Sequence, residues 1–515
     1  MKKLSKRLLA LLLVAIMLIA AGCGKKEEKP ASTGGKDAEV TKAADDKDAG
    51  ATQKPTGEKV KISVTRPTFN IASPDPDQLK KVQDAINAYI GDKINVEIEL
   101  NVISSGEYPN KCNLALAGGE LDLFWTSNWV ETVKTDEVVK NNAVYDLTTL
   151  LPEYGIYTAI PEWTWGASSF DGKNYFIPVY KESAEGYNLM FRKDLIDKYG
   201  WDISTVKSLK DIEPMLADCL TEGLKYPYLT QKTAMFHRYY LDKYDFFSGD
   251  TFIAVDKDAD AVVNAVQTPE FKEFATLMGD WAKKGYLHED DLTKSTTDTT
   301  IQTADWGISW WTNVPNNEEA DSRYSREVEM AKVTESWIMS NTTLGSAYAI
   351  SAAASEAEAK AALEFLSLLY TDITLADLYT FGIEGEDYNR TAEGAVEKTD
   401  AGKYNHSAWE STSVTCLSLE VTDSPDKVEL YKTFNDTAKS SISAGFRFKT
   451  AAVDVEYQAC VQVFNEFGFA LQNGGYTPDE IDAAIADYQK ALDDAGYQTF
   501  LAEAQKQYEE WKKTR

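Results

Sequence analysis

The 515-residue sequence has few of the residues, and none of the motifs, on which catalysis or metal binding usually depends. It contains three histidines, and the motifs GxSxG, HExxH and the P-loop are absent. The stretch 256–261 has the acidic spacing of a calcium loop, but Ala261 and Gln267 replace the glycine and glutamate that the loop requires. The sequence therefore predicts a protein that is not an enzyme and that carries no metal or cofactor.

Basic residues are outnumbered by acidic ones. The chain has 53 Lys and Arg against 82 Asp and Glu, a net charge of −29, which becomes −33 without the four basic residues of 1–22. A chain this acidic is repelled by nucleic acid and by anionic lipid. We therefore exclude DNA and RNA as partners, although acidity alone names no substrate.

Long apolar runs are absent except at the N-terminus. There, basic residues precede an apolar run, Leu8–Ala21, which is short for a membrane span and typical of a secretory signal. The run ends in the letters AAGC. Small residues before a cysteine resemble a lipobox, so we expect 1–22 to be a lipoprotein signal peptide and Cys23 to be lipidated. The alternative is an ordinary signal peptide followed by an incidental cysteine.

The next segment has almost none of the residues that form a core. From Gly24 to Lys59 there is no aromatic residue and one branched aliphatic residue, Val40. Such a composition cannot bury enough apolar surface to offset the entropy lost on ordering. We therefore expect 23–57 to be a flexible acidic and polar tether. It would hold a folded body at the extracellular face of the cell membrane, anchored by lipid only.

The other four cysteines lie far apart and without CxxC spacing: Cys112, Cys219, Cys416 and Cys460. This spacing does not indicate a zinc site. Two disulfides and four buried free thiols are both compatible with it.

Strand and helix patterns alternate in the first part of the body. Apolar and alternating runs predict strands at 60–64, 95–100 and 121–124, with helices at 77–90 and 107–116 between them. This order indicates parallel strands joined by crossover helices, and such sheets bind ligands beyond the carboxyl ends of their strands. The roughly 455 residues after the tether are many for one core, so we expect two lobes.

The stretch LDLFWTSNW (121–129) ends a strand pattern with two tryptophans. Trp125 and Trp129 are separated by Thr126, Ser127 and Asn128. A flat ring can cover the apolar face of a sugar, while polar side chains exchange hydrogen bonds with its hydroxyl rim. We therefore predict a carbohydrate site here, with Trp125 and Trp129 as platforms and Thr126, Ser127 and Asn128 as polar partners, and we favour Trp125 in particular. The alternative is that these rings fill the core, as tryptophans near strands often do.

A second stretch, DWGISWWTN (305–313), also ends in tryptophans, Trp310 and Trp311. Neighbouring strand side chains point to opposite faces, so we expect one of the two to face the core and the other the ligand, and we favour Trp310 for the ligand. The remaining ligand-binding candidates are Asp122, Trp163, Trp165, Tyr180, Glu182 and Glu384. Bracing of the fold, core packing, a surface loop and a helix–helix turn are the competing interpretations for these residues.

The order of several sequence pieces resembles the family-1 extracellular solute-binding proteins, the maltose-binding-protein-like lipoprotein receptors of ABC importers. These pieces are the lipobox, the tether, LALAGGELDLFWTS, DGKNYFIPVY, LMFRKDLIDKYGWD, VVNAVQTPEFKEFATLMGDWAKKGYL and FGIEGEDYN. Residues from about 424 onward are similar to an extra domain of unknown function in one branch of that family.

The resemblance implies an α/β fold of the two-lobe, type II periplasmic-binding-protein class, with a ligand cleft between the lobes and a helical C-terminal extension. It implies a first lobe of 58–170 plus 297–335 and a second lobe of 171–296 plus 336–515. It also implies a monomer that captures a carbohydrate, in particular an oligosaccharide, and delivers it to the permease subunits of an ABC importer. A receptor for peptides or another small solute, a surface glycosidase and a structural adhesin remain alternatives.

Overall fold

The computed structural model describes residues 57–69, 75–247, 252–294, 301, 305–315, 326–399, 403–404 and 406–515. The expected signal peptide, Cys23 and the tether up to residue 56 lie outside this set. The described residues all belong to one unit, Lys54–Arg515. Among them, no helix is long and apolar enough to cross a membrane.

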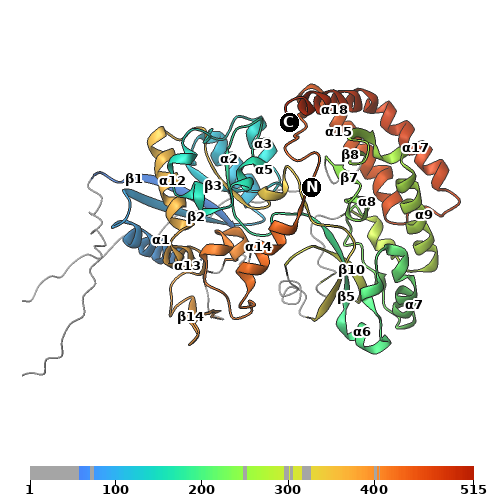
Figure 1. Cartoon of the computed structure of the whole chain (residues 1–515), viewed down its shortest axis with the longest axis horizontal. Coiled ribbons are helices and arrows are strands. Elements are labelled where there is room, and N and C mark those ends of the chain that lie inside the picture. The colour runs from blue at the N-terminus through green and yellow to red at the C-terminus, as the bar shows by residue number, and fades with distance from the viewer. Residues whose placement is uncertain are drawn as a thin grey trace, which may run out of the picture. The chain divides into compact units, whose positions relative to one another are not determined.

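A mixed five-stranded sheet forms the centre of the first lobe (Figure 1). Its strands, in spatial order, are β2 (Val96–Ser104), β1 (Val60–Thr68), β3 (Leu123–Thr126), β13 (Ala347–Ile350) and β4 (Phe176–Pro178). Strand β1 runs parallel to β2 and β3, whereas β13 is antiparallel to β3 and β4. The carboxyl ends of β1 and β3 therefore meet at one edge of the sheet.

Helices α1 (Pro76–Ile90), α2 (Tyr108–Gly118) and α12 (Glu356–Leu369) pack on this sheet. Helix α1 begins at Asp75, whose carboxylate accepts hydrogen bonds from the backbone N–H groups of Asp77 and Gln78. Its apolar residues recur at helical spacing and bury one face. The strands and helices expected between residues 60 and 124 are thus present, with ends shifted by a few residues.

A four-stranded sheet forms the centre of the second lobe. Its strands, in spatial order, are β11 (Val328–Lys332), β5 (Tyr187–Arg192), β10 (Trp306–Thr312) and β6 (Tyr226–Tyr228). Strand β10 pairs antiparallel with β5 and parallel with β6. A separate antiparallel sheet contains β7 (Tyr244–Phe246), β8 (Ile253–Asp256) and β9 (Ala261–Asn264).

The C-terminal helices belong to the core of the second lobe. They are α15 (Asp454–Val463), α17 (Ile481–Asp494) and α18 (Tyr497–Lys512), drawn red in Figure 1 beside α9 (Pro269–Lys284). Tyr488, Phe500 and Tyr508 share one apolar cluster with Phe191 of β5. The helical tail is interrupted between α17 and α18 by Gly496 at a φ of 89°.

The chain passes between the two cores at three places in its described part. One apolar cluster contains residues from Ile62 to Tyr180 and again from Leu344 onward, and the other contains residues from Tyr187 to Met339 and again from Phe446 onward. The short strands β12 (Trp337–Ile338) and β16 (Lys439–Ser440) pair in parallel where two of these passages lie together. These passages are the chain crossings that a two-lobe receptor requires.

The strand pairing corrects the expected division of the chain between the lobes. Residues 297–335 are expected in the first lobe, but β10 and β11 lie in the sheet of the second lobe, where Trp310 is paired with Leu189. Conversely, β13 and α12, expected in the second lobe, complete the core of the first. The order of pieces along the chain does not show which sheet each strand joins, because that depends on long-range pairing.

The four described cysteines, Cys112, Cys219, Cys416 and Cys460, are free and buried. Burial raises the pKa of the Cys112, Cys416 and Cys460 thiols to about 11. These thiols are therefore un-ionised at neutral pH and fill space in the cores.

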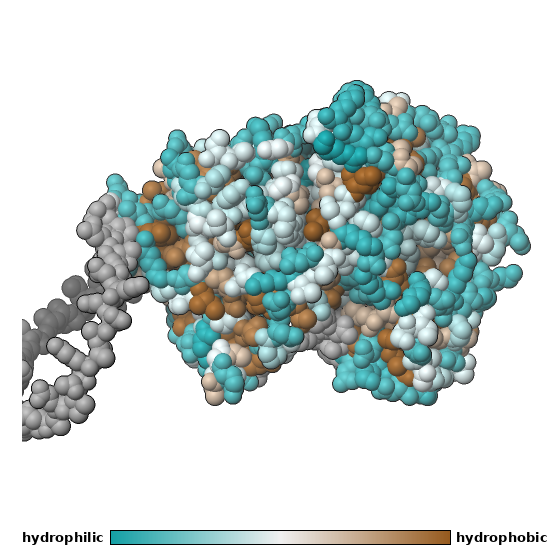
Figure 2. All heavy atoms as spheres, viewed as in Figure 1, coloured by the Kyte–Doolittle hydropathy of each residue, from teal (hydrophilic) through white to brown (hydrophobic). Residues whose placement is uncertain are grey.

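On the visible face of the body, hydrophilic residues predominate, and hydrophobic ones form small separate groups (Figure 2).

Candidate functional site

A cavity of about 330 Å³ lies between the two lobes, where strands of both sheets end. The first lobe contributes Asn128, Trp129, Thr342, Gly345 and Trp409, and the second contributes Trp311, Thr312, Asn313 and Val314. The first passage between the cores supplies Lys181, Glu182, Ala184 and Glu185. Strands β3 and β10 both end at this cavity, as ligand sites beyond carboxyl strand ends require.

Four aromatic rings form the first-lobe wall and the support behind it; we call them the aromatic platform: Phe69, Trp125, Trp129 and Trp409. Trp129 is 48% exposed, and its indole N–H donates to the Gly345 carbonyl at 2.8 Å. Its ring centroid lies 6.3 Å from that of Trp409 and 5.7 Å from that of Phe69. A hydrogen bond and ring packing thus hold the exposed indole of Trp129 in place.

Contrary to the prediction that it is a ligand platform, Trp125 does not line the cavity. The ring is fully buried, with its centroid 5.9 Å from Trp129 and 6.4 Å from Trp409. Because β3 continues to Thr126, Trp125 is still inside the strand, and the Tyr108 hydroxyl donates to its carbonyl. Trp125 therefore supports the two cavity-lining rings from behind and has no exposed surface of its own.

Trp310 and Trp311 lie in two different apolar clusters, as neighbouring strand side chains do, but each is only 9% exposed, and Trp311 packs with Met190 and Trp306. Trp311 lines the cavity. Trp310 belongs to the second-lobe core, where its indole N–H donates to the Thr230 carbonyl at 3.0 Å and the guanidinium carbon of Arg238 lies 3.8 Å from the ring centroid. The cavity therefore has tryptophans on both sides, Trp129 and Trp409 from one lobe and Trp311 from the other.

Polar side chains between these rings are held by further contacts. The Asn128 amide donates to the Asn341 carbonyl at 2.9 Å. The Asn313 amide donates to the Thr334 carbonyl and to the Ser336 hydroxyl, each at 3.1 Å. These bonds fix the orientation of both amides; the Asn313 carbonyl oxygen is buried and meets no donor among the described residues. The wall is thus preorganised for hydrogen bonding to a polar ligand.

Three charged residues line the cavity. Lys181 forms an ion pair with Glu182, its neighbour in sequence. Glu185 is partly buried, and its carboxylate accepts a hydrogen bond from the Tyr187 hydroxyl. Burial raises the pKa of Glu185, against the opposing effect of that hydrogen bond.

Four other predicted site residues lie away from the cavity. Asp122 accepts hydrogen bonds from the backbone N–H of Ser63 at 2.7 Å and from its hydroxyl at 3.0 Å, so it braces β3 against β1. Trp165 stacks on Tyr157 within the first lobe, and Trp163 packs against the same core. Tyr180 is buried in that core as well. In the structure these residues therefore brace the fold or pack in the core, which was the competing interpretation for them.

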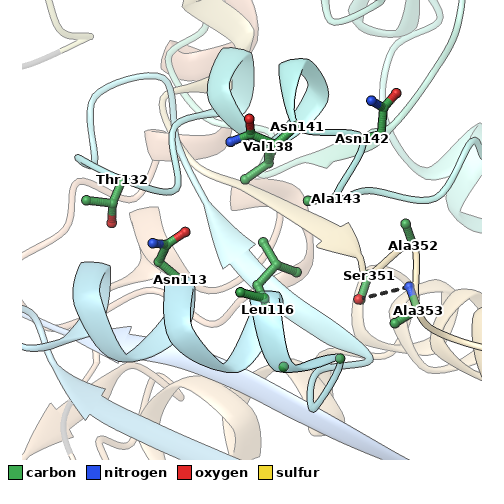
Figure 3. A pocket seen from close by; sticks show the side chains of 13 residues that line it. Asn113, Leu116, Thr132, Val138, Asn141, Asn142, Ala143, Ser351, Ala352 and Ala353 are labelled. Atoms are coloured by element: carbon green, nitrogen blue, oxygen red, sulfur yellow. Dashed lines mark hydrogen bonds between the residues drawn. The ribbon is translucent and has the colours of Figure 1, made fainter.

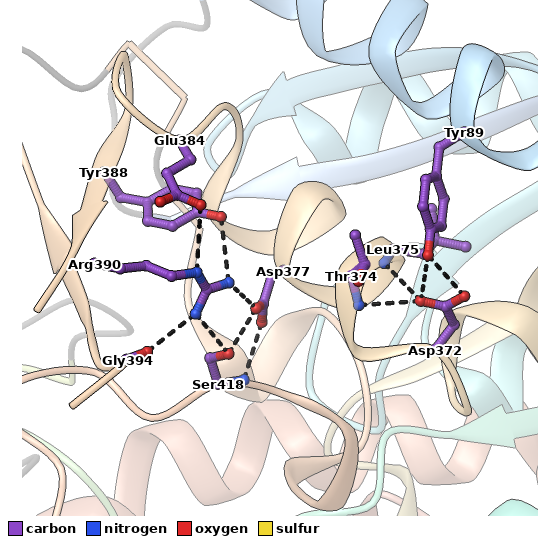
Figure 4. A network of polar contacts seen from close by, with 10 residues as sticks. All are labelled: Tyr89, Asp372, Thr374, Leu375, Asp377, Glu384, Tyr388, Arg390, Gly394 and Ser418. Carbon is purple, nitrogen blue, oxygen red and sulfur yellow. Dashed lines mark hydrogen bonds and ion pairs between the residues drawn. The ribbon is translucent and has the colours of Figure 1, made fainter. Parts of the chain in front are cut away.

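Glu384 also lies elsewhere, in a polar network of the first lobe (Figure 4). Its carboxylate lies 3.4 Å from Nε of Arg390, whose Nη2 lies 2.5 Å from the buried Asp377 carboxylate. Arg390 also donates to the Gly394 carbonyl and the Ser418 hydroxyl, each at 3.0 Å. The network ties α13 (Ile373–Phe381) to the hairpin of β14 (Tyr388–Arg390) and β15 (Val396–Lys398).

A larger hollow, of about 620 Å³, lies on the first lobe beside α2 (Figure 3). Its side chains come from small, aliphatic and amide residues such as Asn113, Leu116 and Asn141, with no charged residue and no aromatic ring. Without a ring it offers no stacking surface for a sugar. The smaller interlobe cavity is therefore the better candidate for the functional site.

Sequence reasoning missed several residues of this cavity, most clearly Trp409. Its neighbours in the stretch AWESTS are small or polar, a composition similar to that of WTSNW around Trp129. That isolated aromatic residue among hydrogen-bonding residues was a signal that could have identified it. Glu185 and Asn313 carry no comparable signal, since an acidic residue and an amide are common in a chain of this composition.

The chain matches the family model of the bacterial extracellular solute-binding proteins over residues 84–384, and that of a domain of unknown function (DUF3502) over residues 442–513. It is 26% identical over 463 residues to a carbohydrate ABC transporter substrate-binding protein from Streptococcus pneumoniae serotype 4. That match covers 85% of this chain and 89% of the other protein.

Solved structures share the fold. An N-glycan transport solute-binding protein from Streptococcus pneumoniae superposes with a TM-score of 0.75 at 24% identity, covering 88% of this chain and 99% of the other. An HMO-binding solute-binding protein from Bifidobacterium longum infantis gives 0.60 at 16% identity, covering 87% and 98%. The expected two-lobe type II fold is thus confirmed. The chain belongs to the bacterial extracellular solute-binding proteins and carries the domain of unknown function found in one branch of that family.

Proposed function

We propose that this protein captures an oligosaccharide in the interlobe cavity and delivers it to the permease subunits of an ABC importer. The observation that carries the proposal is that Trp129 and Trp409 of the first lobe line the same cavity as Trp311 of the second lobe, together with amide and carboxylate side chains. Rings from both lobes can cover the apolar faces of sugar units, while Asn128 and Glu185 bind hydroxyl groups. Peptide ligands do not require this combination of flat surfaces and acceptor groups.

The names of related proteins support a carbohydrate ligand. The pneumococcal relative is described as a carbohydrate transporter component, and the N-glycan transport protein has been solved in complex with Man1GlcNAc and with Man5GlcNAc. Another structural relative was solved with kestose. The volume of about 330 Å³ lies at the lower end of the range for ligand sites, about 300–1,000 Å³, which suits a few sugar units with the rest of the chain outside.

Both lobes contribute to the site, so a ligand that touches both walls favours the arrangement in which the walls are close. Such a ligand shifts the population toward a closed state by its differential affinity for that state. A permease that recognises the closed arrangement can then distinguish loaded from empty receptor. This role requires no chemical change in the sugar, so we assign the protein no enzymatic activity.

The anchor and the location follow from the N-terminal sequence. We propose that Cys23 carries lipid after removal of 1–22, and that the tether 23–57 holds the monomeric body at the extracellular face of the cell membrane. A chain held in this way samples ligands outside the cell and remains close to its permease.

A binding screen on the mature protein tests the ligand class. Isothermal titration with neutral oligosaccharides, Man5GlcNAc among them, is expected to show binding, and a peptide panel none. Trp129→Ala should weaken the best glycan about 5- to 150-fold, the loss of about 1–3 kcal/mol that a stacking residue provides. Trp201→Ala is the matched control, because Trp201 stacks on Tyr199 in the second lobe and does not line the cavity. Binding of peptides without any glycan would replace this proposal with a peptide receptor.

A further inference from the structure

We infer that the cavity accepts uncharged glycans and rejects acidic ones, and that Glu185 is the residue that makes this distinction. The inference rests on the proposed function and specifies the class of sugar. Of the 13 described residues that line the cavity, the only charged ones are Lys181, Glu182 and Glu185. The balance among these three groups decides which ligand charge the wall tolerates.

The single cation on the wall is already neutralised. The Lys181 ammonium is paired with the Glu182 carboxylate, and both side chains are largely buried, 15% and 21% exposed. A ligand carboxylate that approached Lys181 would have to compete with a partner fixed on the adjacent residue. Lys181 therefore offers little to an anionic sugar.

The carboxylate of Glu185 has a neutral partner. Its hydrogen bond comes from the Tyr187 hydroxyl, and among the described residues no Lys, Arg or His lies within ion-pair distance of it. Arg238 and Lys257 oppose the rise in the pKa of Glu185 through their charges, but neither residue lines the cavity. Arg238 lies on the Trp310 ring, and Lys257 is paired with Asp245 at 3.0 Å. An anionic group that entered beside Glu185 would thus meet a negative charge with no cation between them.

The backbone of Glu185 is also held in place. Its backbone N–H donates to the Trp337 carbonyl at 2.8 Å, and the Trp337 N–H donates to its carbonyl at 2.7 Å. The next residue is Gly186, where an added Cβ would lie 2.5 Å from the Glu335 carbonyl oxygen and closer still to the Asn313 amide. Such close packing fixes the backbone here, and the hydrogen bond from the Tyr187 hydroxyl holds the Glu185 carboxylate.

An ionised carboxylate accepts hydrogen bonds and donates none. The hydroxyl groups of a neutral sugar are donors and satisfy it, as would an ammonium group. The carboxylate of a uronic or sialic acid brings acceptors only, and like charges at contact distance in a partly buried site repel strongly. The same wall that binds a neutral glycan therefore excludes its acidic counterpart.

A glycan array tests the inference on many sugars at once. Neutral glycans are printed beside the same glycans carrying a terminal sialic acid or with primary hydroxyls oxidised to uronates. The mature protein is expected to bind certain neutral glycans and to bind their acidic counterparts at least tenfold more weakly. Glu185→Gln keeps the shape of the side chain and removes its charge. It is expected to reduce the ratio of neutral to acidic glycan binding at least threefold.

Glu384→Gln is the matched control, because it removes one negative charge outside the cavity and should leave the ratio unchanged. Melting temperatures verify that both variants fold. If Glu185→Gln does not fold, Glu185→Ala is used in its place. Equal binding of neutral and acidic glycans by the unmodified protein overturns the inference and leaves the proposed function intact. An unchanged ratio in folded Glu185 variants also overturns it. Failure of every glycan to bind overturns the proposed function itself, and the inference with it.

Discussion

Replacement of Trp125 by alanine should reduce the stability of the fold, whereas replacement of Trp129 should mainly reduce binding. Trp125 is fully buried and lies among Phe69, Tyr108, Trp129 and Trp409. A buried tryptophan removes about 200 Å² from water. At about 25 cal/mol per Å² this is worth about 5 kcal/mol. Partial collapse of the resulting hole brings the expected loss of folding free energy to about 3–5 kcal/mol.

Trp129 is 48% exposed, so its truncation should cost less than about 2 kcal/mol of stability. Urea unfolding followed by far-ultraviolet circular dichroism gives both values without relying on tryptophan fluorescence, which the substitutions themselves alter. Titration with a bound glycan gives the affinities on the same samples. Trp125→Phe, which keeps a ring behind Trp129 and Trp409, should recover most of the stability. If Trp125→Ala lowers the unfolding midpoint no more than Trp129→Ala does, the assignment of Trp125 as buried support is refuted.

Further predictions concern the anchor, the ligand and one buried histidine. Cys23→Ala should leave a folded body that is released from the membrane fraction, which fractionation and immunoblotting would measure; complete retention with membranes would contradict the lipid anchor. A bound oligosaccharide should raise the melting temperature with the logarithm of its excess, and scanning calorimetry that finds no shift with any glycan would contradict the proposed ligand class. Burial lowers the pKa of His406 from 6.5 to about 4. Because the unfolded chain then binds a proton between these values that the folded chain does not, stability should fall as the pH falls through this window, by up to about 3 kcal/mol. Urea midpoints at pH 7 and pH 4.5 should therefore differ less for His406→Asn than for the unmodified protein, and equal differences would contradict this account.

Local signals in the sequence predicted the elements of the first lobe because those elements are made by neighbours. Helix α1 follows from Asp75 as a cap and an apolar stripe, and β1 follows from a short run of β-branched residues. Local signals did not predict where a strand ends. Trp125 was predicted to lie at the tip of a strand, but β3 continues one residue further, and that single residue determines that Trp129, and not Trp125, reaches the cavity.

Contacts between distant residues could not be read from the sequence. Trp409 lies beside Trp129 although they are far apart in the chain, and only the folded first lobe brings them together. The alternation between Trp310 and Trp311 was predicted from strand geometry, but which ring faces the core depends on the pairing of β10 with β5 and on Arg238. Four predicted site residues do line the cavity, and their roles in binding remain predictions: Asn128, Trp129, Glu182 and Trp311.

The discontinuous lobes have a consequence for how this chain is made. Strand β3 lacks its neighbour β13 until residue 347 has been synthesised, and the second core lacks Phe500 and Tyr508 until translation has passed residue 508. Neither core can therefore be completed early, since each must wait for residues that follow an intervening segment of the other lobe. Pairing across such long separations is slow to form, because the entropy of a large loop must be lost before any contact compensates for it. We therefore expect neither core to be complete until nearly the whole chain has been synthesised.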